Sequence, residues 1–293
     1  MLAAIVVNPI GGRGTGMQVA VEACDELNRA GWRTELMPTR CAGDGIELAH
    51  QAALKGFDVV LACGGDGTFS QVVMGCRDTG VPVGLIPAGT GNDFARMIDL
   101  PREPRAAANA LVNGHPKSVD LLEVNNGAVW SVNMVGVGFD ARVAERTNRR
   151  VRWIGGRTAY MLAIALELIH HRCARMRVRV DDIEWEGEAL LLAVANTRSY
   201  GGGMIVAPDA KIDDGMADVV LIERLSRFQF IRSFPLVLKG THVRLPQVHQ
   251  WRGREVTIMS DDEQPALVDG DVVAHTPITV RISPGRALVW IPG

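Results

Sequence analysis

The stretch that decides the fold is Cys63-Gly64-Gly65-Asp66-Gly67-Thr68-Phe69-Ser70, which follows the apolar run Val59-Val60-Leu61-Ala62. Four to eight apolar residues between turn signals are typical of a buried strand in a parallel sheet. A helix is predicted over residues 68–75, so the glycines occupy a strand-to-helix turn. Glycines let the backbone approach a ligand closely, and the free N–H groups of a helix N-terminus favour an anion such as phosphate.

Asp66, within this turn, carries a charge that repels a phosphate. A divalent cation, Mg²⁺ above all, would bridge the carboxylate and the phosphate and remove the conflict. The alternative is a plain strand–helix turn that binds nothing, and this stretch alone does not separate the two.

Two further predicted strands end in turns of the same kind. The strand 81–87 runs into Ala88-Gly89-Thr90-Gly91-Asn92-Asp93-Phe94-Ala95-Arg96, and the strand 3–7 runs into Asn8-Pro9-Ile10-Gly11-Gly12-Arg13-Gly14. The carboxyl ends of parallel strands meet at one edge of a sheet, where open α/β sheets bind ligands. Three such turns together favour a nucleotide site over three unrelated plain turns.

The motifs at residues 64–68 and 89–96 resemble those of the diacylglycerol kinase catalytic domain. Its superfamily includes sphingosine kinases, ceramide kinases and soluble bacterial lipid kinases. The Gly-Gly-Asp-Gly core is shared with NAD kinases and phosphofructokinases, and the second motif favours the lipid kinases. The resemblance implies an enzyme of phospholipid metabolism that uses ATP and Mg²⁺ to phosphorylate a lipid hydroxyl. Diacylglycerol, phosphatidylglycerol and sphingoid bases all present such a hydroxyl.

Bulk composition places the chain among ordinary globular proteins. It has 293 residues, 47% apolar and 22% charged, with a net charge of −2 that gives no reason to expect nucleic-acid binding. Five cysteines without a Cys-x-x-Cys pair are typical of a reduced cytoplasmic protein. The apolar residues 1–7 form a predicted strand, and the helical stretch 160–169 is too short to span a bilayer. We therefore expect a cytoplasmic protein with at most peripheral contact at the inner membrane face. A homodimer is left open, because no residue reports on oligomeric state.

The fold predicted is α/β followed by β. Residues 1–120 alternate strands and helices, which predicts a parallel sheet covered by helices, and the resemblance implies that residues 284–293 complete this nucleotide-binding domain. Residues 121–283 are dominated by predicted strands with short links, which predicts an antiparallel β-sandwich for the lipid substrate. The active site is expected in the cleft between the domains. Residues 175–180 alternate Arg with Met or Val, which predicts a half-exposed strand. The other predicted strands of the second half are 121–124, 129–135, 189–195, 217–222, 255–259, 266–269, 278–282 and 287–291, and the predicted helices are 157–171 and 227–239.

The resemblance also implies which residues of the first domain act. Nucleotide contacts are implied for Asn8, Pro9, Gly11, Gly12, Thr39, Gly64, Gly65, Asp66, Gly67, Thr68, Phe69, Ser70 and Thr90. Asp66, Asp93 and Asp120 are implied to form a network around the catalytic Mg²⁺. As bare residues, Thr39 also fits a plain strand end and Asp120 a cap at the start of a strand.

A second metal site is implied in the β domain. Residues 199–204 and 207–216 resemble the segment of bacterial lipid kinases that binds a structural Mg²⁺. The implied ligands are the Asp214 carboxylate and the main-chain carbonyls of Lys211 and Met216. Carbonyls with one carboxylate suit a hard cation. The alternative is an acidic β-turn without a metal.

Asp271 is the candidate proton acceptor, in Val268-Asp269-Gly270-Asp271. The resembled family usually has Glu at this position, and Asp shortens the reach by about 1.5 Å, one C–C bond. Since a misplacement of about 1 Å can cost 10²-fold in rate, either the backbone compensates or Asp269 shares the work. The alternative is a hairpin turn of solvated acids.

Two segments bear on membrane contact. Residues 142–157 carry six arginines and Trp153, which suits either reversible attachment to an anionic membrane surface or a solvated loop and helix start. Phe228, Phe230, Phe234 and Leu236 are interpreted as core packing rather than a lipid groove.

Two other functions remain alternatives to a lipid kinase. One is a kinase of a soluble acceptor such as NAD, which shares the Gly-Gly-Asp-Gly-Thr core. The other is a catalytically weak, nucleotide-bound lipid sensor, suggested by Asp instead of Glu at position 271.

Overall fold

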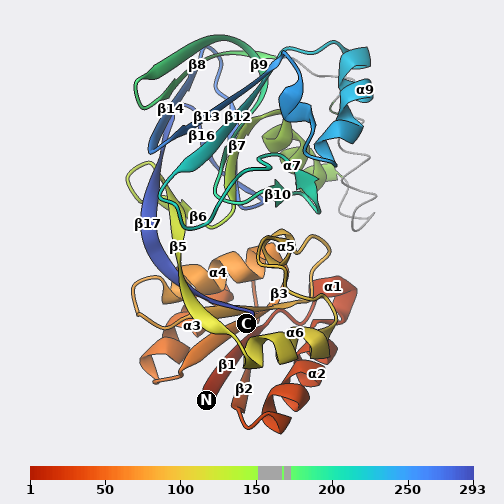
Figure 1. Cartoon of the computed structure of the whole chain (residues 1–293), viewed down its shortest axis with the longest axis vertical. Coiled ribbons are helices and arrows are strands. Elements are labelled where there is room, and N and C mark those ends of the chain that lie inside the picture. The colour runs from red at the N-terminus through yellow and green to blue at the C-terminus, as the bar shows by residue number, and fades with distance from the viewer. Residues whose placement is uncertain (151–166, 168–172) are drawn as a thin grey trace. The chain divides into compact units, whose positions relative to one another are not determined.

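The computed structural model describes residues 1–150, 167 and 173–293, which form two compact units (Figure 1). The N-terminal unit comprises Met1–Asp120 and Gly285–Gly293, and the C-terminal unit comprises Leu121–Pro284. The chain leaves the first unit within β5 (His115–Val124) and returns within β17 (Ile278–Ile291). An α/β fold followed by an antiparallel β fold confirms the predicted fold class. Within the described residues, no helix has the length and apolarity needed to span a membrane.

The N-terminal unit is built on a parallel sheet in the order β2-β1-β3-β4, with the end of β17 beside β4. Its strands are β1 (Leu2–Val7), β2 (Arg33–Pro38), β3 (Val59–Gly64) and β4 (Val83–Pro87). The central strands β3 and β4 are buried along their whole length, because helices cover both faces of the sheet. This burial explains why these strands are continuous apolar runs in the sequence.

Two pairs of helices cover the sheet (Figure 1). Helices α2 (Gly16–Arg29) and α6 (Pro104–Val112) pack together, as do α3 (Asp44–Leu54) and α4 (Asp66–Cys76). Two short helices, α1 (Gly11–Gly14) and α5 (Asp93–Met97), follow β1 and β4. The chain moves from β1 to β2 in one direction across the sheet and from β2 to β3 and β4 in the other. The strand order therefore reverses between β1 and β3, the position where open α/β sheets form a crevice for ligands.

The C-terminal unit consists of antiparallel strands in two layers around a core. Its strands are β6 (Val129–Ser131), β7 (Met134–Gly138), β8 (Ala174–Val180), β9 (Ile183–Ala195), β10 (Ser199–Tyr200), β11 (Met204–Ile205), β12 (Ala217–Glu223), β13 (Val248–Gly253), β14 (Glu255–Ser260), β15 (Pro265–Val268) and β16 (Asp271–His275). The helical elements are α7 (Phe139–Arg150), α9 (Arg227–Val237) and the 3₁₀ turn η1 (His242–Arg244).

The long strand β9 joins the two layers of this unit. Its first half pairs with β8, and its second half pairs with β7 and β12. Strand β8 alternates buried and exposed residues, which confirms the predicted half-exposed strand. Strand β12 is buried on both faces, because Val219 faces the core between the layers and Val220 faces a second apolar cluster with Phe230 and Phe234 of α9.

Three predictions about local structure need correction. The predicted strand 129–135 is divided into β6 and β7 at Val132 and Asn133, where a distant carboxylate binds the chain. The predicted strands 278–282 and 287–291 are one strand, β17. Phe230 and Phe234 do pack in the core, but Phe228 is exposed. The predicted helix 157–171 lies almost wholly outside the described residues, as does the end of the arginine-rich segment. Arg142 of that segment donates to Gln264 Oε1 at 2.5 Å.

Candidate active site

The three glycine-containing turns of the N-terminal unit lie in contact with one another. Asn8 N, after β1, donates to Cys63 O in β3 at 3.0 Å, and Ala88 N, after β4, donates to Gly64 O at 2.8 Å. These hydrogen bonds continue the parallel ladders past the strand ends. The predicted convergence of the turns at one edge of the sheet is therefore present in the structure.

Glycine is required where these turns touch. A Cβ atom added to Gly89 would lie 2.4 Å from the Gly65 Cα atom, and one added to Gly12 would lie 2.4 Å from the Ala88 carbonyl oxygen. Gly12 also has a φ of +59°, in the left-handed region that favours glycine. The β4 turn thus packs against both other turns through main chain alone.

Asn92 and Asp66 hold the β4 turn in this position. Asn92 Oδ1 accepts from Gly89 N at 3.0 Å, and Asn92 Nδ2 donates to Gly89 O at 2.9 Å. Asp66 Oδ1 accepts from Phe94 N at 3.0 Å, which ties the β3 turn to the first turn of α5. Asn92 therefore fixes the shape of the β4 turn, and Asp66 joins that turn to the β3 turn.

Asp93 and Asp120, the other predicted acids of this unit, are buried with partners. Asp93 Oδ1 accepts from Arg96 Nη1 at 2.8 Å. Asp120 Oδ1 accepts from Gly285 N at 2.7 Å, where β17 enters the unit. Across the part of the chain that the structure describes, no group of three or more His, Cys, Asp or Glu side chains is placed to hold a metal. A magnesium network around Asp66, Asp93 and Asp120 stays a prediction.

The residues predicted to contact the nucleotide differ in how accessible they are to a ligand. A Cβ atom added to Gly67 would meet no atom within 4 Å, so there is open space beside the first turn of α4. Thr39 N donates to Val7 O at 2.8 Å, which places Thr39 at the same sheet edge, and Thr90 is exposed. The Phe69 ring, in contrast, is buried with its centroid 4.3 Å from that of Phe94. Phe69 can therefore face a ligand only through its main chain.

The candidate base lies on a tight hairpin of the C-terminal unit. Asp269 and Gly270, with φ values of +48° and +105°, form the two-residue turn between β15 and β16, and Val268 pairs with Asp271. Both central residues have positive φ, as in a type I′ turn, for which Asp-Gly is a preferred sequence. Asp271 is exposed at the start of β16. The segment therefore forms the hairpin turn that was one of its two interpretations.

Asp269, however, is not a solvated acid, because its carboxylate binds the chain between β6 and β7. The donors are Ser131 Oγ at 2.6 Å, Val132 N at 2.8 Å, Asn133 N at 2.9 Å and Met134 N at 3.2 Å. Both oxygens are occupied, so Asp269 positions the hairpin, and of the two acids Asp271 is the one that presents its carboxylate to solvent.

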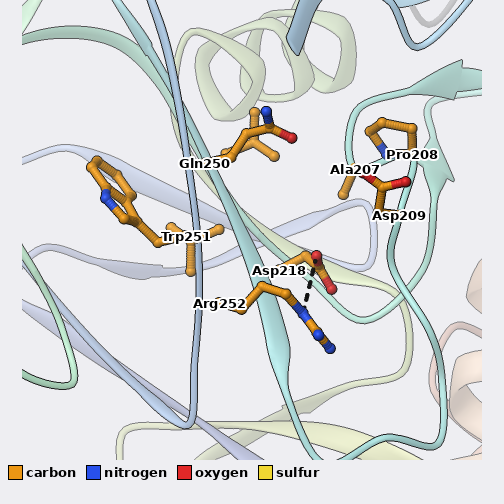
Figure 2. A pocket seen from close by; sticks show the side chains of 9 residues that line it. Ala207, Pro208, Asp209, Asp218, Gln250, Trp251 and Arg252 are labelled. Carbon is orange, nitrogen blue, oxygen red and sulfur yellow. Dashed lines mark ion pairs between the residues drawn. The ribbon is translucent and has the colours of Figure 1, made fainter. Parts of the chain in front are cut away.

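The predicted structural metal segment lies at the end of the β12–β13 pair. Asp214 accepts from Met216 N at 3.2 Å and also pairs with Arg252. Arg252 Nε lies 3.5 Å from Oδ1 of Asp218, its cross-strand partner, as Figure 2 shows. Asp218 and Arg252, together with Asp209, border a cavity of about 240 Å³.

Asp218 is the least compensated acid of this segment. It is 8% exposed, and its Oδ2 atom has no hydrogen-bond partner. Burial raises the pKa of Asp218 to about 6, and the charges of Asp214 and Asp209 also raise it while Arg252 lowers it. An unsatisfied carboxylate oxygen beside two further acids fits a bound cation.

Comparisons with known proteins agree with this architecture. Residues 3–124 match the diacylglycerol kinase catalytic domain, and residues 133–291 match the YegS C-terminal NAD kinase beta sandwich-like domain. A diacylglycerol kinase from Mycobacterium tuberculosis is 35% identical over 98% of this chain and 94% of its own length. The chain belongs to the diacylglycerol kinase family. This confirms the resemblance seen in the sequence and the expectation of a lipid kinase.

A second curated relative and two solved structures are similar over nearly the whole chain. The diacylglycerol kinase of Bacillus subtilis is 31% identical over 92% of this chain and 89% of its own length. A solved structure from Bacillus anthracis has a TM-score of 0.81 at 23% identity, covering 100% of this chain and 97% of that one. Another from the same organism, a diacylglycerol kinase, has a TM-score of 0.75 at 20% identity, covering 100% and 96%. The structural likeness shows a shared fold.

One buried acid of the C-terminal unit is not among the residues predicted from the sequence. Asp140, at the start of α7, is buried, and burial raises its pKa to about 6. It accepts from Ala141 N at 2.9 Å and from the Tyr200 hydroxyl at 3.2 Å. A Cβ atom on Gly136 would lie 1.8 Å from Asp140 Oδ2. The signal was there, since Gly136 and Gly138 precede this acid at a strand-to-helix junction like those of the N-terminal unit.

Asp140 borders a small apolar cavity of about 60 Å³. Phe230 and Phe234 of α9 line its other side, with the buried His242, whose pKa burial lowers. The inner face of α9 is therefore part of a core that contains polar groups.

Proposed function

We propose that the chain transfers the γ-phosphoryl group of ATP, in the presence of Mg²⁺, to the hydroxyl of a diacylglycerol-like lipid. The observation that supports this most directly is the contact of three glycine turns at the switch point of the parallel sheet, with open space beside Gly67. Main-chain N–H groups at such an edge suit a polyphosphate. The names of the relatives supply the class of acceptor.

Phosphoryl transfer depends on positioned phosphates, balanced charge and a group that takes the proton of the attacking hydroxyl. In this proposal the turns after β1, β3 and β4 hold the phosphates, and Asp66 keeps two of these turns together through Phe94 N. Magnesium, when bound, balances the negative charge of the phosphates. Asp271 accepts the hydroxyl proton, since Asp269 is occupied by the β6–β7 segment.

The second magnesium site of the proposal is structural. Its ligands are the Asp214 carboxylate and the carbonyls of Lys211 and Met216. The unsatisfied Oδ2 atom of Asp218 supports a cation in this neighbourhood. A bound cation would offset the repulsion among these acids and so stabilise the turn before β12.

The direct test is incubation of the protein with radiolabelled ATP, Mg²⁺ and a panel of lipids that includes diacylglycerol, phosphatidylglycerol and sphingosine. We expect label in phosphatidic acid, reduced about 10²-fold or more by Asp66→Ala, because loss of this contact misplaces the phosphate turns. Asp25→Ala, on the exposed side of α2, is the matched control and should keep full activity. Absence of lipid label above the Asp66→Ala level would refute a lipid kinase.

A catalytically weak lipid sensor is the second candidate. The specific observation in its favour is that Asp269 is held by four donors, so the shorter Asp271 has no partner acid for the chemistry. If Asp271→Glu creates activity that the wild type lacks, the sensor is correct; if the wild type already turns over, it is excluded. NAD as acceptor in the same assay separates a soluble-acceptor kinase from both.

A further inference from the structure

Helix α9 lies on the outside of the C-terminal unit (Figure 1), and three large apolar side chains of its residues and its C-cap are exposed. Phe228 is 74% exposed, Ile231 62% and Leu238 40%. Three of the twelve large apolar side chains exposed in the described part of the chain thus fall within residues 228–238. Single exposed apolar residues are normal on a protein surface, but a contiguous group marks an interaction site.

These three side chains form a stripe that is distinct from the face of α9 that packs on the core. At 3.6 residues per turn, Phe228, Ile231 and Leu238 share an arc of roughly 80°. Phe230, Phe234 and Val237 point to another side of the helix, against the second apolar cluster of the unit. The helix is therefore apolar on two sides, and only one of them contributes to the core.

Basic residues flank the exposed stripe on both edges. On the same helical projection Arg227 borders one edge and Arg232 borders the other, and Lys239 follows the C-cap Leu238 in the turn after the helix. All three side chains are exposed. Between Glu223 and Glu255 the sequence holds seven Arg and Lys residues and no Asp or Glu. The surface around the stripe is thus apolar in the middle and positive at its margins.

We propose that α9 docks on a membrane that contains anionic lipids, with Phe228, Ile231 and Leu238 inserted at the interface. This rests on the proposed function, because a kinase of diacylglycerol must reach a substrate that resides in a bilayer. An apolar stripe with basic margins is the pattern of helices that lie in the plane of a membrane interface. The long basic side chains reach the anionic headgroups while the apolar side chains contact the acyl region.

The charge pattern favours a bilayer over a protein partner. Arg227, Arg232 and Lys239 lie beside the stripe, and residues 224–254 contain no acid, so this helix and its margins complement a negative surface. A protein partner would need a matching apolar groove with acids on both sides. A bilayer of anionic lipid offers this combination at every point.

The test is cosedimentation of the full-length protein with vesicles of phosphatidylcholine alone or mixed with phosphatidylglycerol. We expect binding to the mixed vesicles that weakens with salt. The double substitution Phe228→Ser and Ile231→Ser should weaken it about tenfold or more, since each residue loses its burial in the interface. The double substitution Arg232→Gln and Lys239→Gln should weaken it on the order of tenfold, and only on the anionic vesicles.

Matched controls separate docking from general effects. Ile183→Ser with Met259→Ser removes two exposed apolar side chains elsewhere on the same unit, and Arg33→Gln with Lys55→Gln removes two exposed charges of the other unit. Both should leave vesicle binding unchanged. Phe228→Leu with Ile231→Leu keeps the stripe apolar and should keep binding. Thermal unfolding of each variant shows that the fold is intact.

Activity on a short-chain diacylglycerol in detergent micelles distinguishes this proposal from the proposed function. Vesicle binding through α9 by a protein that phosphorylates no lipid would support the docking and refute the kinase. Activity in micelles without vesicle binding, or binding that the α9 substitutions leave unchanged, would overturn the docking. The docking proposal would also be overturned if substitutions in the stripe changed only self-association or the binding of other proteins.

Discussion

The candidate sites of the two units depend on different kinds of contact, between main-chain atoms in one unit and through side chains in the other. In the N-terminal unit, main-chain atoms of three turns meet, and glycines are needed because a Cβ atom would collide. In the C-terminal unit, side chains do the positioning, as when Asp269 binds four donors that lie more than 130 residues earlier in the chain. The N-terminal turns depend on glycines that leave room for close main-chain contact. The C-terminal hairpin depends on a carboxylate that binds residues distant in the sequence. Substitutions should therefore affect the two units in different ways.

The largest expected effect separates the neighbouring acids Asp269 and Asp271. Asp269→Ala leaves the donors of the β6–β7 segment without their acceptor, and we expect it to lower the free energy of unfolding by about 3–4 kcal/mol. Asp271→Ala, at an exposed position, should change the free energy of unfolding by less than about 0.5 kcal/mol while lowering kinase activity. Urea unfolding and the ATP assay measure the two. Equal stability of both variants would show that Asp269 does not position the hairpin.

The next effect concerns Gly89 in the N-terminal unit. Gly89→Ala forces the β4 turn away from Gly65, and overpacking of this kind should cost about 3 kcal/mol of stability. Gly91→Ala is a poor control because its surroundings hold Arg96 and Arg102. Gly67→Ala is the better one, since its Cβ atom meets nothing within 4 Å. A Gly89→Ala protein as stable as the wild type would mean that the turns do not require this contact.

The buried carboxyl group of Asp140 in the C-terminal unit should make the stability of the protein depend on pH. The folded state raises the pKa of Asp140 from 3.8 to about 6, so it binds the proton more tightly than the unfolded state does. The stability that this group contributes is full below pH 4 and is lost as the pH rises through 6. Relative to Asp140→Asn, the wild type should lose about 2–3 kcal/mol across this range. Parallel pH–stability curves for the two proteins would contradict the burial of an ionisable group here.

The smallest expected effect on stability is that of a substitution at Gly67. Gly67→Ala has room in the fold and adds a better helix former, so stability should stay the same or rise by up to about 1 kcal/mol. A methyl group in the space proposed for phosphate should nevertheless weaken ATP binding by about tenfold. Isothermal titration with Mg·ATP measures this. Unchanged affinity would place the nucleotide away from α4.

The features that the sequence predicts correctly are those that depend on neighbouring residues. Glycine turns after apolar strands and the Asp-Gly hairpin were recognised because their residue types are tied to conformations of neighbouring residues. The alternation of β8 was recognised because one of its faces is exposed. The division of residues 129–135 into two strands was missed, since it results from the distant Asp269.

The sequence by itself determined the alternation of strands and helices in residues 1–120, the three glycine-containing turns and the family, because all of these depend on short-range patterns. Only the tertiary structure decided that Asp269 is a positioning residue, that Asp140 is buried with a raised pKa, and that Phe228 points outward while Phe230 points inward. Burial and partnership depend on residues far apart in the chain, and no local pattern specifies them.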